Sequence, residues 1–222
     1  MTALYLYPPQ TVLKRVIPKT RIYDGAGAGT ALRERFVREV EQITWAHKLA
    51  PETLNLPASE AVPEIQVIRL TLKGAALHDD ILRAIDRAIP FPLIFELWAQ
   101  GRVMAAAAYK RPSGAERGKW VLSDPLRGDW VAQDAPRAPL PVAVNLATLY
   151  DRMLAALMPI AAAPGEDVES RLARLAAIKA KEREIAQLQA RLRRESQFNI
   201  KLALHGQLAE AQAQFDHLKK PG

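Results

Sequence analysis

The C-terminal part of the chain contains a long stretch that lacks helix-breaking residues. Between Glu166 and Lys220 there is no proline, and Gly206 is the only glycine. Apolar residues recur there mostly at every third or fourth position, namely Leu172, Leu175, Ile178, Ile185, Leu188, Leu192, Leu202, Leu208, Phe215 and Leu218. A stripe of this kind has to be buried against another helix. The sequence therefore predicts a C-terminal coiled-coil element in residues 165–222.

Two arrangements of this coiled-coil element are compatible with the sequence. A continuous helix would form a rod of roughly 80 Å, at about 1.5 Å per residue. The polar segment from Glu195 to Asn199 breaks the heptad pattern, so the chain can also turn back as a hairpin. The residues expected to bind a protein partner or a second copy of the chain are Leu188, Leu192, Phe198, Asn199, Lys201 and Leu208.

Residues 31–164 show the mixture of patterns typical of an α+β domain. The spacing of apolar residues predicts an amphipathic helix from Ala31 to Lys48. A buried strand over residues 65–72 and a helix over residues 79–89 follow, and then strands over residues 93–98, 102–110, 119–123 and 128–132. A last helix begins after Asn145, which can cap it. This order predicts a small antiparallel sheet with packed helices.

Residues 1–30 are predicted to form a basic extended arm that ends in a glycine-rich loop. The formal charge of +7 lies at the two ends of the chain: residues 1–48 hold 8 Lys and Arg against 4 Asp and Glu, and residues 166–222 hold 11 against 8. Clustered cations attract the phosphates of nucleic acids whatever their sequence. Contacts to DNA phosphates are therefore expected at Lys14, Arg15, Lys19, Arg21 and Lys48. An ordinary solvated basic surface is the alternative explanation.

Several classes of site are excluded or disfavoured by composition. The chain has no cysteine, which excludes disulfides, thiolate zinc sites and cysteine nucleophiles. Its four histidines lack the spacing of metal ligands, so neither a metal nor a cofactor is expected. No apolar run approaches the ~20 residues of a membrane span, and the N-terminus lacks the pattern of a secretory signal. A cytoplasmic protein without a membrane partner is expected.

One fragment is compatible with an enzyme. Glu64 stands at the start of the predicted strand over residues 65–72, and Lys73 follows its end. A divergent Mg²⁺-dependent nuclease would use carboxylates to hold the metal and a lysine to stabilise developing charge. The second carboxylate cannot be identified in the sequence, and a solvated strand entry is the better explanation of Glu64. Catalysis therefore stays open, and the balance favours a non-catalytic protein.

Short motifs distributed along the chain point to a family. They are Ile17-Pro18-Lys19, Glu41-x-Ile43-x-Trp45-x-x-Lys48-Leu49, Pro51-Glu52-Thr53-x-Asn55-Leu56, Glu64-Ile65-Gln66-Val67, Ile85-Asp86-x-x-Ile89-Pro90, Tyr109-Lys110 and Glu195-x-Gln197-Phe198-Asn199-x-Lys201. In this order they resemble the uncharacterised bacterial domain-of-unknown-function family 4391. The Gly25–Gly29 run looks like an insertion relative to that family, and His205 stands where asparagine is expected.

The resemblance implies a cellular context and no particular reaction. Members of this family are similar to accessory proteins encoded beside helicases and DNA methyltransferases in restriction or phage-defence clusters. The expected function is therefore that of a non-catalytic accessory or adaptor protein in a bacterial DNA restriction-modification or phage-defence complex. Its C-terminal helices would bind a helicase or methyltransferase subunit, or self-associate, and its N-terminal arm would contact DNA. The alternatives are the Mg²⁺-dependent nuclease and a purely structural coiled-coil interaction protein.

Overall fold

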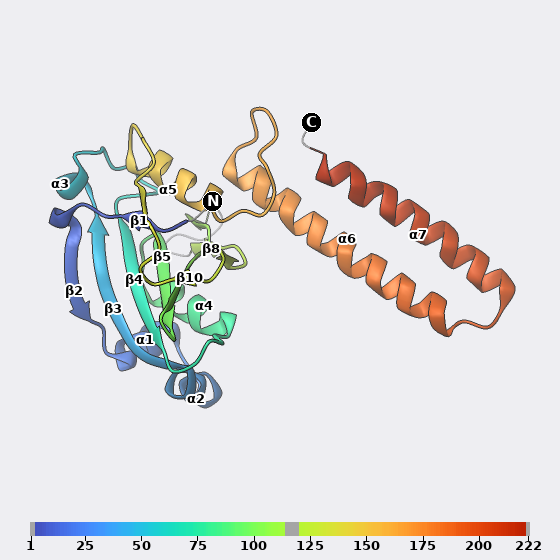
Figure 1. The fold of residues 1–222 in the computed structure, drawn as a ribbon, viewed down its shortest axis with the longest axis horizontal. Helices are drawn as coiled ribbons and strands as arrows, with labels where there is room; N and C mark the ends of the chain where they lie inside the picture. The colour runs from blue at the N-terminus through green and yellow to red at the C-terminus, as the bar shows by residue number, and fades with distance from the viewer. Residues whose placement is uncertain (1–2, 114–119, 221–222) are drawn as a thin grey trace. The chain divides into compact units, whose positions relative to one another are not determined.

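The computed structural model describes residues 3–113 and 120–220, which form two compact units that meet between Met158 and Pro159. The first unit, here called the body, combines a seven-stranded sheet with helices, and the second is a pair of long helices (Figure 1). The α+β fold class is thereby confirmed. The sequence placed the boundary after Pro164, a few residues beyond the observed division.

The body is built on a mixed sheet in the order β10-β6-β5-β4-β3-β2, with β9 also paired to β6. These strands are β2 (Val12–Val16), β3 (Val40–Leu49), β4 (Ile65–Leu72), β5 (Leu93–Ala99), β6 (Arg102–Ala107), β9 (Leu126–Arg127) and β10 (Val131–Ala132). The predicted antiparallel sheet is wrong in one respect, because β4 and β5 run parallel. Helix α4 (Asp79–Ala88) makes the crossover that a parallel pair requires.

Two small ladders flank this sheet. They pair β1 (Tyr5–Leu6) with β11 (Ala138–Pro139) and β7 (Lys110–Pro112) with β8 (Trp120–Leu122). The predicted strand over residues 102–110 is thus divided between β6 and β7, and Lys119 at the start of another predicted strand lies outside the described residues. The two residues between β5 and β6, Gln100 and Gly101, both have positive φ, as a tight hairpin turn requires.

The helix predicted from Ala31 to Lys48 is wrong beyond its first half. Helix α2 (Thr30–Glu39) gives way directly to the strand β3. The register of β3 against β4 shifts at two places, and buried residues fall at every third position of β3: Val40, Ile43, Ala46 and Leu49. Each bulge inserts one extra residue, so the two-residue period of a strand becomes a spacing that resembles a helix.

The predicted extended arm is also wrong, because residues 1–30 belong to the body. After β1 and a short 3₁₀ helix, η1 (Pro9–Thr11), the chain forms the edge strand β2 and then helix α1 (Lys19–Ala26). The glycine run is therefore only partly a loop. Gly27 ends α1 with a φ of 60°, and a Cβ on Gly25 would lie 2.9 Å from that of Ala88, so Gly25 lets α1 approach α4 closely.

One hydrophobic core of the body lies between one face of the sheet and the helices α1, α2 and α4, which Figure 1 shows together in the lower part of the body. Phe36 of α2 and Leu70 of β4 are fully buried there. Two further helices, α3 (Pro51–Leu54) and α5 (Leu146–Ala155), complete the body. Asn145 caps α5 as predicted, because its side chain accepts a hydrogen bond from the Thr148 amide.

The second unit is an antiparallel hairpin of α6 (Val168–Arg194) and α7 (Phe198–Lys219), hereafter the hairpin. Its turn falls in the polar segment that the sequence identified, so the chain adopts the hairpin alternative and not the rod. The apolar stripe packs on itself: Ile185, Leu188, Leu204 and Ala211 are buried, and Leu192, Leu208 and Phe215 pack against them.

The core of the body provides a matched test on two adjacent residues of α2. We expect Phe36→Ala to lower the free energy of unfolding by about 3–5 kcal/mol, because it leaves a cavity at a site without solvent exposure. Val37→Ala, at a side chain that is 58% exposed, should change it by less than about 0.5 kcal/mol. Urea denaturation measures both, and equal effects would contradict the packing described.

Candidate functional site

Three of the five predicted phosphate-binding cations are exposed. Lys14 and Arg15 lie on the edge strand β2, where Lys14 has a φ of 52° beside an irregularity in the register, and Arg21 lies on α1. A lysine and a bulge on an edge strand also discourage pairing with another chain. The contribution of these three residues to DNA binding stays a prediction.

The other two cations already have partners within the body. The Lys19 ammonium donates to the carbonyl of Val40 at 2.5 Å, and burial lowers the pKa of Lys19, with the charge of Lys73 adding to the effect. Lys48 forms ion pairs with Glu52 at 2.7 Å and Glu64 at 3.2 Å, and hydrogen bonds to these carboxylates raise its pKa. Lys48 is therefore less available to phosphate than the exposed cations.

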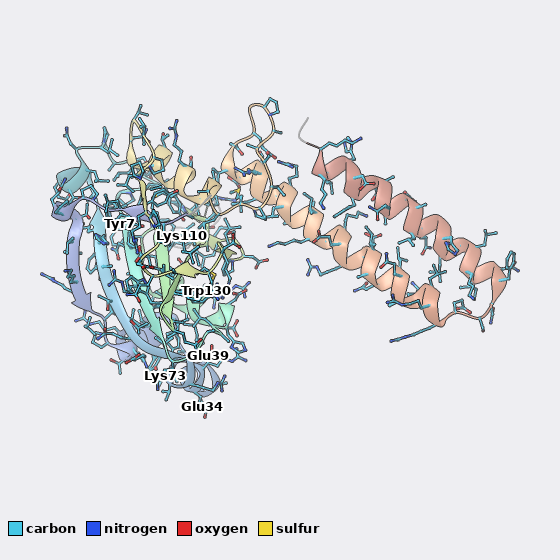
Figure 2. All side chains as sticks on the ribbon, in the orientation of Figure 1. Tyr7, Glu34, Glu39, Lys73, Lys110 and Trp130 are labelled. Atoms are coloured by element: carbon cyan, nitrogen blue, oxygen red, sulfur yellow. The ribbon has the colours of Figure 1, made fainter. Side chains whose placement is uncertain are left out.

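The structure does not bring together the residues of the nuclease alternative. Glu64 and Lys73 lie beyond opposite ends of the eight-residue strand β4. Glu64 interacts with Lys48 and Gln66, whereas the Lys73 amide donates to the carbonyl of Glu39, near which Lys73 lies in Figure 2. Residues 3–113 and 120–220 contain no group of three or more His, Asp or Glu side chains suited to a metal ion. The geometry offers this alternative no support.

The six predicted partner-binding residues separate into two groups in the hairpin. Leu188, Leu192 and Leu208 contribute to its own apolar core. Phe198, Asn199 and Lys201 are exposed at the start of α7. The first group is already buried without a partner, so only the second group lies free on the surface in this structure.

The turn of the hairpin carries both apolar and cationic side chains, and residues 191–205 are here called the hairpin tip. Phe198 is 78% exposed, Ile200 38% and Leu202 64%. Four cations lie within the tip, Arg191, Arg193, Arg194 and Lys201, against a single acid, Glu195. None of the four forms an ion pair with another residue that the structure describes. The rest of residues 166–222 is electrically balanced, so the tip holds the whole positive excess of the C-terminal part.

A buried polar cluster links residues of two sequence motifs. Lys110, labelled in Figure 2, is 1% exposed and its ammonium donates to the carbonyls of Asp86 and Ile89 at the C-terminal end of α4. The last carbonyls of a helix lack intrahelical donors, and a cation there also complements the helix dipole. Lys110 therefore caps α4 from a strand that is distant in sequence, and it is inaccessible to a substrate.

Burial of the Asp86 carboxylate is the energetically unfavourable part of this cluster. Asp86 is 1% exposed, and neither of its carboxylate oxygens has a hydrogen-bond partner among the described residues. Burial raises the pKa of Asp86 to about 7, which the positive charge of Lys110 opposes, and burial lowers the pKa of Lys110 to about 8. Sequence reasoning found the two motifs and missed their pairing, since no local pattern connects them.

A second polar cluster lies on the sheet face opposite the helix core. Glu96 of β5 is 1% exposed and accepts hydrogen bonds from the Arg137 guanidinium and from Trp98 Nε1, the latter at 3.2 Å. Arg137 also donates to the carbonyl of Tyr5 at 3.1 Å, which ties the N-terminal segment to the sheet. Nearby, burial lowers the pKa of His47 to about 4, so this imidazole is neutral at pH 7.

The protein thus consists of an α+β body followed by a helical hairpin. The hairpin tip carries exposed apolar side chains together with cations, and the described residues contain no cluster suited to a metal ion. Residues 6–215 match the family described as a domain of unknown function (DUF4391), and the chain belongs to that family. No curated protein and no solved structure shows a significant match. No helix of the described residues has the length and apolar character required to cross a membrane.

The pH dependence of stability tests the burial of Asp86. Because its pKa is raised from 3.8 to about 7, the folded state keeps a proton that the unfolded chain releases, and stability falls as the pH rises through this range. Asp86→Asn removes this titrating group. We therefore expect the free energy of unfolding of the variant, minus that of the wild type, to increase as the pH rises from about 4 to about 7. Urea denaturation across this range measures it, with Asp24→Asn at an exposed position as the control. If the free energies of unfolding of Asp86→Asn and wild type change with pH in the same way, the raised pKa of Asp86 is contradicted.

Proposed function

We propose that this chain is a non-catalytic adaptor of a cytoplasmic bacterial DNA restriction-modification or phage-defence complex. Its hairpin tip binds a protein partner, a helicase or DNA methyltransferase subunit, and its N-terminal segment contacts DNA phosphates. The main support for this proposal is the hairpin tip, which combines exposed apolar side chains with cations that form no ion pair among the described residues. The defence context follows from the resemblance of the sequence motifs to accessory proteins of such clusters.

The composition of the hairpin tip favours a protein surface that is acidic around an apolar centre. An exposed phenylalanine with neighbouring aliphatic residues can fill a pocket, which is the usual source of affinity in a protein interface. The surrounding arginines and Lys201 favour a partner of opposite charge and accelerate encounter.

Co-purification from the native host tests partner binding. We expect the double variant Phe198→Ser/Leu202→Ser to recover at least about tenfold less partner than the wild type, because it removes the apolar centre of the tip. The matched control is Val142→Ser/Val144→Ser, which removes two side chains of comparable exposure, 84% and 77%, from the body. Circular dichroism verifies that the hairpin stays helical. Equal recovery with the tip variant, or equal loss with the control, would refute binding through the tip.

Contact with DNA is tested separately, on the exposed cations of the N-terminal segment. We expect Lys14→Gln/Arg15→Gln/Arg21→Gln to weaken binding to a generic duplex and to reduce the slope of log K against log salt by about 0.9 for each phosphate that is no longer neutralised. A triple variant of exposed hairpin cations, Lys179→Gln/Arg183→Gln/Lys219→Gln, is the control. Affinity that does not depend on salt, or that survives removal of the three N-terminal charges, would exclude this interaction.

A further inference from the structure

Arg69 occupies an unusual position for a cation, in the middle of the seven-stranded sheet. The register places Thr44 of β3, Arg69 of β4 and Glu96 of β5 in one row across three neighbouring strands. Directly opposed residues lie on the same face of a sheet, and the adjacent residues Ile68 and Leu70 belong to the helix-covered core. Arg69 therefore lies on the opposite face, where its side chain is 34% exposed.

The guanidinium of Arg69 is held in place and is only loosely paired. Its central carbon lies 4.0 Å from the centroid of the Trp98 ring. The separation between Arg69 Nη2 and Glu96 Oε2 is 3.7 Å, and Arg69 Nε is buried without a hydrogen-bond partner among the described residues. Stacking on an aromatic ring fixes the orientation of a guanidinium and reduces its contact with water. Arg69 is thus oriented by Trp98 more than by the carboxylate.

Glu96 is already neutralised by another residue. Arg137 donates to both of its carboxylate oxygens, through Nη1 and, at 3.2 Å, through Nη2. A two-point arginine–carboxylate pair of this kind is strong and geometrically specific. The charge of Arg69 is therefore surplus on this face of the sheet.

Further hydrogen-bonding groups surround Arg69 on the same face. Thr44 and Thr71 are half-buried there, and Gln42, which is exposed, pairs with Thr71 in the register. A hollow of about 350 Å³ adjoins them, lined by Val16, Ile17, Pro18, Lys19, Glu41, Gln42, Ile43 and Thr71. The polar groups on this face are thus the guanidinium of Arg69, the hydroxyls of Thr44 and Thr71 and the amide of Gln42. Within the hollow, the Lys19 ammonium already donates to the carbonyl of Val40, and Glu41 is the one carboxylate among the lining residues.

We propose that the part of this face from Arg69 to Thr71 and Gln42, at the rim of the hollow, is a binding site for a phosphate group. A tetrahedral phosphate accepts several hydrogen bonds at once, and arginine with hydroxyl and amide donors is a set that proteins use to bind it. The phosphate belongs either to a small molecule or to a nucleic-acid strand. This site lies in the body and does not depend on partner binding by the hairpin tip.

Binding is measured at low ionic strength with two probes, inorganic phosphate by calorimetry and a fluorescent single-stranded oligonucleotide by anisotropy. We expect saturable binding of at least one probe to the full chain. Displacement of the oligonucleotide by inorganic phosphate identifies the phosphate group itself as the ligand. Saturable oligonucleotide binding that phosphate does not displace, and that still depends on Arg69, identifies a nucleic-acid strand as its source.

Substitutions separate this site from general basic character. We expect Arg69→Gln to weaken binding about tenfold, Thr71→Val to weaken it a few-fold, and Arg69→Lys to lie between wild type and Arg69→Gln. The matched control is Arg83→Gln. Arg83 lies on α4, its side chain is 33% exposed, and it forms an ion pair with Asp124. If Arg69→Gln does not fold, the affinities of Arg69→Lys and Thr71→Val for the two probes test the proposal. The proposal is overturned if neither probe saturates, or if the Arg69 and Thr71 variants bind as the Arg83 control does.

Discussion

The attachment of α4 to the sheet is the constraint on which the body depends. This helix carries the chain from β4 to the parallel strand β5, so its position fixes the order of the central strands. Ile81, Leu82 and Ile85 bury its apolar side, and Lys110 caps its end from a separate ladder. The cap matters because the last carbonyls of a helix have no intrahelical donor. The Lys110 ammonium donates to two of them, and the ionised form of Asp86 offsets part of the cost of burying this cation.

The fold could be predicted where local pattern and tertiary structure agree. The buried strand at residues 65–72, the turn at Gln100 and Gly101 and the cap at Asn145 all follow from residue chemistry within a few positions. The error in β3 has a specific physical origin. Two bulges gave a strand the three-residue spacing of buried positions that usually indicates a helix, although Val40, Ile43, Thr44 and Trp45 are residue types that favour strands.

The candidate sites show the same limit. Exposed cations near the N-terminus and the polar turn of the hairpin are visible in the sequence, because each is a cluster along the chain. Arg69 is a single cation within a buried-strand pattern, and its significance appears only when the register places it beside Trp98 and shows that Arg137 already neutralises Glu96. Lys110 and Asp86 likewise come together only through the crossover. Sites assembled from several strands require the pairing of those strands to be known.

Because the apolar stripe of the hairpin packs on itself, a partner can use it only at a cost. Ile185, Leu188, Leu204 and Ala211 are buried against one another within one chain, so a partner that used them would first have to separate α6 from α7. A second copy could replace α7 with its own and bury the same residues, which is the geometry of a domain-swapped dimer with each chain extended as a rod. A different partner gains nothing from the stripe unless it supplies equivalent packing. The tip, whose apolar side chains are exposed without any rearrangement, is therefore the less costly place for a partner to bind.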